Sequence, residues 1–193
     1  MLVAGEMQWA RRTLLIEAIA LAAFPATAVK PLTPPKSANI HWQGPGGALH
    51  GYMAIPAKAH GAQPAVMVVH DAGGADAFIR NLTDRVAQAG FVACAPTRLA
   101  SLDEAAATVK WLATNAYATG KVGAIGIGWG GALLERVAAL SPSGLAAIVN
   151  FGASDDMGGQ VPTLRLDALG HYSGDHYAQA WARAIAFLKE HLA

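Results

Sequence analysis

The chain has 193 residues and a formal net charge of +1, and hydrophobic residues make up 53% of it against 14% for charged ones. A chain with this composition can bury a sizeable core and is not a disordered tail, and its scattered Lys and Arg residues provide no basic surface for nucleic acid. The single cysteine, Cys94, excludes an intramolecular disulfide and a thiolate metal cage, and its apolar run GFVACAP favours a small core residue over a nucleophile.

Residues 1–28 have the layout of an export signal. Arg11 and Arg12 precede an apolar run that ends in small residues, as a signal with a cleavage site requires, and the paired arginines resemble a twin-arginine signal. Glu17 interrupts the run, so an amphipathic helix packed on the domain is the alternative. The run is too short and too interrupted to predict a membrane span.

Three segments follow from this pattern. We predict a cleaved signal over 1–28, starting at Met1 or Met7, then a Pro-rich extended linker over 29–37 and a single domain over 38–193. The protein is therefore expected to be exported, to the periplasm or outside the cell, with no stable membrane span after cleavage of the signal.

The domain alternates strand and helix patterns in chain order. Apolar or alternating runs predict strands over 38–43 and 48–54, as a hairpin around GPGG, and over 65–70, 91–95, 121–127, 145–152 and 162–167. Helical spacing predicts helices over about 77–89, with Phe78, Leu82, Val86 and Ala87 on its apolar side, from Ser101 with a Glu104 capping box, over 129–140, and at the C-terminus.

A hairpin followed by repeated strand–helix units predicts an α/β fold. The sheet is expected to be mostly parallel and doubly wound, with an N-terminal antiparallel hairpin and helices on both faces. Binding and catalytic sites in such sheets lie at the carboxyl ends of the strands.

The stretch KVGAIGIGWGG joins a buried strand to a helix through alternating glycines. Enzymes with this arrangement place a reactive Ser or Cys at the middle position, which here is Gly128. Gly126, Gly128 and Gly131 also fit the spacing of a dinucleotide-binding loop. That alternative is disfavoured because the turn follows a late strand and no acidic residue ends the next strand, LAAIVNFG.

Four stretches together resemble the dienelactone hydrolase family of α/β-hydrolases: VVHDAGG, LTDRVAQAGFVACAP, the glycine turn and AWARAIAFLKEHL. The similarity extends through most of residues 38–193. It implies an α/β-hydrolase fold and the hydrolysis of a carboxylic ester or lactone, without a cofactor or a metal.

The resemblance also assigns roles to particular positions. The family carries its Cys or Ser nucleophile at position 128, so Gly128 leaves the site without an attacking atom. His171 matches the family's base, and the backbone N–H groups of Ala72 and Trp129 match the oxyanion-hole donors. Asp71 matches an acidic residue that controls protonation of the nucleophile. A surface-loop histidine and a loop-capping aspartate are the alternatives for His171 and Asp71.

Two parts of the family pattern are altered. Only 43 positions separate Gly128 from His171, fewer than the family uses, so the domain is expected to be shortened near its C-terminus. Asp155 and Asp156 are the nearby candidates for the triad acid, with a solvated loop as the alternative. Arg98 is a candidate for binding a substrate carboxylate, because the family's own arginines are absent.

The sequence therefore predicts a hydrolase-like protein that is weakly active or inactive and binds a small hydrophobic ester or acyl compound. An Asp71–His171 pair that activates water directly would be a slow alternative. Another alternative is a non-catalytic exported binding or interaction domain, with no partner identified. Its candidate anchors are Trp42, Trp129 and Trp181, for which core packing is the competing interpretation.

Overall fold

The computed structural model describes residues 33–70, 74–140, 142–152, 159–169 and 174–193. These residues form seven strands: β1 (Lys36–Gly44), β2 (Gly47–Ile55), β3 (Gln63–Val69), β4 (Val92–Pro96), β5 (Ala118–Ile127), β6 (Leu145–Phe151) and β7 (Thr163–Leu166). They also form four helices: α1 (Ala77–Gln88), α2 (Leu102–Ala113), α3 (Trp129–Ala139) and α4 (Gly174–Leu192). Within this part of the chain, none of the helices combines the length and apolar character that crossing a membrane would take.

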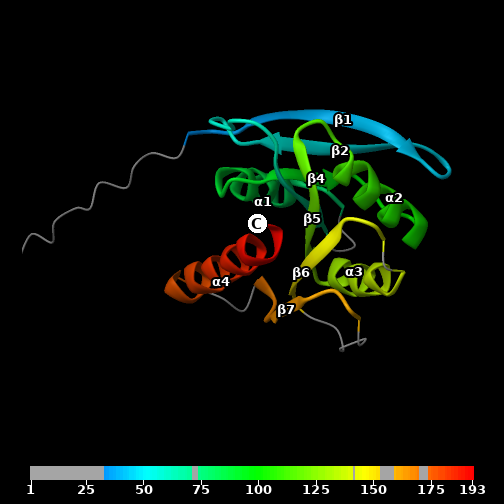
Figure 1. Cartoon of the computed structure of the whole chain (residues 1–193). Coiled ribbons are helices and arrows are strands. Elements are labelled where there is room, and N and C mark those ends of the chain that lie inside the picture. The colour runs from blue at the N-terminus through cyan, green and yellow to red at the C-terminus, as the bar shows by residue number, and fades with distance from the viewer. Residues whose placement is uncertain (1–32, 71–73, 141, 153–158, 170–173) are drawn as a thin grey trace, which may run out of the picture. The chain divides into compact units, whose positions relative to one another are not determined.

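All seven strands belong to one sheet in the order β1-β2-β4-β3-β5-β6-β7 (Figure 1). β1 and β2 pair as an antiparallel hairpin, and β2 pairs antiparallel with β4. The remaining neighbours, from β4 to β7, are parallel. This arrangement confirms the predicted α/β fold with a mostly parallel sheet and an antiparallel hairpin. β1 begins at Lys36, inside the range predicted as a linker.

The helices cover both faces of the sheet. One core cluster joins α1 and α4 to residues such as Val66 and Val68, and the other joins α2 and α3 to Met67 and Val69. Successive residues of β3 thus face opposite layers, which is why this strand is an unbroken apolar run. Cys94 belongs to the second cluster, and its burial raises the pKa of the thiol to about 12. The predicted core role of this cysteine is confirmed.

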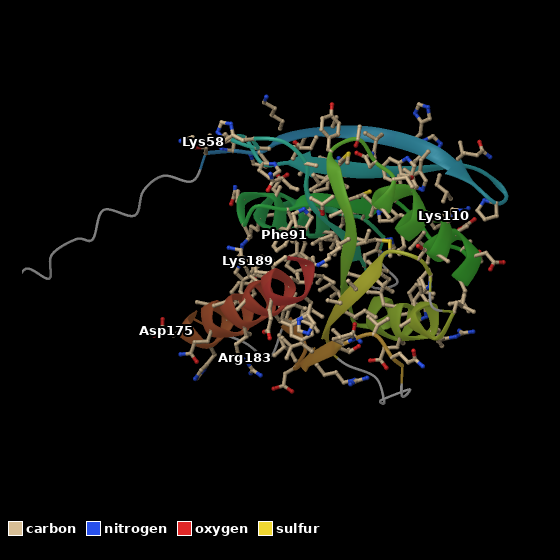
Figure 2. All side chains as sticks on the ribbon, in the orientation of Figure 1. Lys58, Phe91, Lys110, Asp175, Arg183 and Lys189 are labelled. Carbon is tan, nitrogen blue, oxygen red and sulfur yellow. The ribbon has the colours of Figure 1, made fainter. Side chains whose placement is uncertain are left out.

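Charged residues lie on the solvent-facing side of α4, and the opposite side of this helix packs on a core cluster that includes Phe91. Asp175, Arg183 and Lys189 are exposed on this helix, and Phe91 is buried in the core cluster that α4 helps to form (Figure 2). The amphipathic pattern of the C-terminal helix therefore has its expected consequence, a helix that packs on the sheet through one side.

The start of α1 corrects one prediction. Phe78 was predicted on the apolar side, but it is 48% exposed, whereas Ile79 is buried. Asp76 caps the helix by accepting a hydrogen bond from the Ile79 N–H at 3.0 Å. From there, Ile79, Leu82, Thr83 and Val86 have the spacing of one helix face and point inward, so Phe78 falls beside that face.

The predicted capping box of α2 is present in a shifted form. The Ser101 hydroxyl accepts from the Glu104 N–H at 3.2 Å, as predicted. The Glu104 carboxylate reaches one residue further back than usual and accepts from the Ala100 N–H at 2.6 Å. The two bonds fix where the loop after β4 ends and the helix begins.

Candidate functional site

The backbone bend expected at residue 128 is present at the carboxyl end of β5, the strand between β3 and β6. Gly128 has φ of +53° and ψ of −119° and is the N-cap of α3. Its N–H donates to the Phe151 carbonyl at 2.8 Å, and its carbonyl accepts from the Gly131 N–H at 3.0 Å. A positive φ in a sharp strand-to-helix turn is the geometry of a nucleophile elbow, and glycine adopts it without steric cost.

The flanking glycines allow α3 to approach the sheet closely. A Cβ on Gly126 would lie 2.4 Å from the Gly131 Cα, and a Cβ on Gly130 would lie 2.5 Å from the Val69 carbonyl oxygen. Neither distance is compatible with a real side chain. The run of glycines therefore fixes the position of the helix start relative to β3 and β5, whatever residue occupies the bend itself.

A buried polar network joins the same helix to strands β6 and β7. Glu135, on α3, accepts from Asn150 Nδ2 at 2.7 Å and from Arg165 Nε at 3.1 Å. Glu135 is 4% exposed and Asn150 is fully buried. Glu135 and Arg165 also line a cavity of about 210 Å³ beside Thr163. The members of this network lie far apart along the chain and follow no motif, so the network could not be predicted from the sequence.

Three small residues lie side by side at the carboxyl ends of β5, β6 and β7. A Cβ on Gly152 would lie 3.3 Å from the Ala168 Cβ and 3.7 Å from the Gly128 Cα, and the Gly152 N–H donates to the Leu166 carbonyl at 3.0 Å. Asp167, which is exposed, follows β7 directly in this row. Asp167 was not among the predicted acid candidates, and its position at the end of a predicted strand is the signal that could have identified it.

The other predicted site residues divide into two groups. Trp129 is the first residue of α3 and is 50% exposed, and Arg98 is exposed beyond the end of β4. The structure thus places Trp129 next to Gly128, while Arg98 follows a strand that β3 separates from β5. The remaining predicted residues, Asp71, Ala72, Asp155, Asp156 and His171, lie outside the described residues, and their roles stay predictions.

The three tryptophans considered as anchors differ in their environments. Trp42 is 4% exposed, stacks on Trp111 with ring centroids 4.7 Å apart, and donates from Nε1 to Thr108 Oγ1 at 3.2 Å. Trp181 is half-buried, with the Arg85 guanidinium 4.8 Å from its ring centroid. Trp42 is therefore a core residue, and Trp129 alone of the three is widely exposed.

Sequence comparison finds two family matches. Residues 49–101 match the dienelactone hydrolase family, and residues 83–161 match the X-Pro dipeptidyl-peptidase (S15) family. The chain is also 45% identical over 56 residues to a protein of Escherichia coli (strain K12) described as the hydrolase fragment YghX. That match covers 29% of this chain and 48% of the relative, so the chain spans about half of it.

Solved structures share the fold across most of the chain. A dienelactone hydrolase-like promiscuous phosphotriesterase from metagenomic libraries aligns with a TM-score of 0.69 and 18% identity, over 83% of this chain and 100% of its own. A dienelactone hydrolase from Klebsiella pneumoniae aligns with a TM-score of 0.63 and 16% identity, over 80% and 99% respectively. One from Anabaena variabilis gives 0.64 and 14%, over 83% and 100%. The matches and the architecture agree: the chain has the α/β-hydrolase fold, and over residues 49–101 it is similar to the dienelactone hydrolase family.

Proposed function

We propose that the chain keeps the framework of an ester or lactone hydrolase but lacks the nucleophile, and is therefore weakly active or inactive as a covalent hydrolase. The observation that carries this proposal is Gly128 at the elbow, with φ of +53° and ψ of −119°, directly after β5 and at the start of α3. A covalent intermediate needs a hydroxyl, thiol, amine or carboxylate at this point, and glycine offers only hydrogen.

Other parts of the proposed site do not depend on the missing side chain. Trp129 begins α3, so its backbone N–H lies at the helix N-terminus, where partial positive charge favours an oxyanion. Together with the Ala72 N–H, it would polarise an acyl carbonyl. His171 would act as the base, with Asp71 as a neighbour of the elbow. A small hydrophobic ester or acyl compound is the proposed ligand, with Arg98 as an outlying contact.

Asp167 joins Asp155 and Asp156 as a candidate for the acid that orients the histidine. It follows β7, whose last residue pairs with the end of β6, and so lies at the same edge of the sheet as Gly128. This position supports Asp167 as a candidate, because catalytic residues of such sheets follow the carboxyl ends of strands.

Turnover of p-nitrophenyl acetate tests the proposal. We compare the wild type with Gly128→Cys, Gly128→Ser and, as the matched control for backbone strain, Gly128→Ala. Gly128→Cys is expected to exceed Gly128→Ala by roughly 10²-fold or more, and His171→Ala in the same chain should remove the gain. Robust wild-type turnover that depends on His171 would contradict the proposal and favour direct activation of water.

An exported binding domain is the second proposed function, supported by the exposed Trp129 beside the elbow. An apolar ring half open to solvent next to a site without a nucleophile suits the recognition of an acyl group or of a protein partner. Quenching of tryptophan fluorescence by short-chain acyl esters, lost in Trp129→Ala and kept in Trp181→Ala, would support ligand binding. Equal quenching in both variants would contradict it.

Export is also proposed, on the basis of the predicted signal in residues 1–28, which lie outside the described part of the chain. N-terminal sequencing of the protein recovered from outside the cytoplasm is expected to begin near Val29. Recovery of a soluble protein that retains residues 1–28 would reject cleavage.

A further inference from the structure

Two histidines face each other across the β1–β2 hairpin. His41 and His50 are directly opposite in the antiparallel register, both are exposed, and their ring centroids lie 6.1 Å apart at an interplanar angle of 44°. We propose that this pair binds one divalent transition-metal ion, such as Zn²⁺, Ni²⁺ or Cu²⁺, with water completing the coordination.

The spacing of the two rings is close to what one ion requires. Neutral imidazole is the common nitrogen ligand of these metals, with a metal–nitrogen distance of about 2.0–2.1 Å for zinc. Two imidazoles on one ion then have ring centroids roughly 5 Å apart, by simple geometry from that distance. His41 and His50 need to close by about an ångström, which small side-chain rotations supply because directly opposite Cβ atoms already lie about 5 Å apart.

The backbone under the pair is held in place before any ion binds. His41 precedes Trp42, whose indole is buried against Trp111 and bonded to Thr108 of α2. The His50 carbonyl accepts a 2.8 Å hydrogen bond from the Thr97 N–H. Binding therefore orders the imidazole rotamers but not the strands, and a preorganised pair of ligands loses less entropy than two ligands on a loose loop.

The surroundings set the expected strength. Asn39 and Gln43 lie two residues either side of His41, so they share its face and supply amide groups rather than carboxylates. Arg80 donates to Asn39 Oδ1 at 3.0 Å, which places a cation near the pair and opposes tight binding. Within the described residues, no group of three or more His, Cys, Asp or Glu side chains is placed to hold a metal. The site is thus a two-ligand surface site of modest affinity.

The pair is distinct from the elbow. β4 and β3 lie between β2 and β5 in the sheet, so the proposed metal site does not include Gly128 or its neighbours. Metal binding by His41 and His50 does not depend on whether the site at Gly128 is catalytic, so separate experiments test the two proposals.

Calorimetric titration of Zn²⁺ into the untagged full chain tests the inference. His41→Gln and His50→Gln are each expected to weaken Zn²⁺ binding by at least about tenfold, and the double variant should bind more weakly than either single one. His60→Gln, which removes another exposed histidine, is the matched control and should leave the affinity unchanged. Equal Zn²⁺ affinity in the wild type and the double variant would overturn the proposal, as would an equal loss in His60→Gln.

A second measurement needs no variant and so does not depend on their folding. Substoichiometric Cu²⁺ added to the wild-type chain should broaden the imidazole NMR signals of His41 and His50 before those of His60 and His191. Broadening that begins elsewhere would place the ion at another site and reject the hairpin pair.

Discussion

The glycine at position 130 gives the sharpest test of how the elbow is held. A Cβ added there would lie 2.5 Å from the Val69 carbonyl oxygen and 2.8 Å from that of His70, and both are backbone atoms at the carboxyl end of β3. Gly130→Ala must therefore push α3 away from β3, at a cost of about 3 kcal/mol for overpacking against rigid atoms. The better helix propensity of alanine returns about 1 kcal/mol. We expect a net loss of about 2 kcal/mol.

Two further variants calibrate the effect. Gly131→Ala gains the same helix propensity, and the atoms nearest to its Cβ belong to the Asn150 side chain, at 3.1 Å, so its stability should stay within about 1 kcal/mol of the wild type. Gly46→Ala, in the hairpin turn, meets nothing within 4 Å and should change stability by less than about 0.5 kcal/mol.

Urea unfolding followed by circular dichroism measures these differences, and the loss in Gly130→Ala corresponds to a fall in Tm of about 4–8 °C. A Gly130→Ala protein as stable as Gly46→Ala would refute the claim that close contact between helix and strand positions the elbow.

Three other predictions concern the core. Cys94 should stay unreactive to DTNB in the native protein at pH 8 and react fully in urea. Because burial raises the pKa of this thiol from 9.0 to about 12, the stability that it contributes below pH 9 should be lost as the pH rises toward 12. A stability that does not change with pH in that range would contradict this prediction. Arg165→Met removes the cation beside buried Glu135 and should cost about 2–3 kcal/mol, less in a chain that also carries Glu135→Gln; equal losses would argue against the ion pair. Trp42→Phe loses the hydrogen bond to Thr108 and should lower the free energy of unfolding by about 1 kcal/mol, as measured by thermal unfolding. An unchanged Tm would show that this hydrogen bond does not stabilise the fold.

The order of strands and helices could be predicted from the sequence because the residue pattern within each element indicates which of its sides are buried. The run AVMVV, residues 65–69, is apolar at every position, which is typical of a strand covered on both faces, and β3 is buried on both faces. Ser101 and Glu104 carry a cap signal within one helical turn, and the cap forms. In these elements the information lies within a few residues, where pattern and propensity are reliable guides.

Features that depend on partners far along the chain could not be predicted in the same way. Asn150 donates a hydrogen bond to Glu135, fifteen residues away, and the sequence around either residue does not indicate its partner. Phe78 has helical spacing to Leu82 and Val86, but Ile79 is buried at the start of α1 in its place, and the local pattern does not distinguish these two neighbouring apolar residues. Asp167 falls within the range predicted as the last strand, whereas in the structure it follows β7, which ends at Leu166.

The shape of the backbone bend at Gly128 is determined by its neighbours. Gly126, Gly130 and Gly131 admit the close approach of α3, and Asn150 fills the space beside them while bonding to the same helix. In an active hydrolase these contacts force a residue with a Cβ into a positive φ, at a cost of about 1–3 kcal/mol. Glycine at position 128 adopts this conformation without that cost, so the bend does not depend on a catalytic side chain there. A side chain returned to position 128 should therefore lower stability even where it restores turnover.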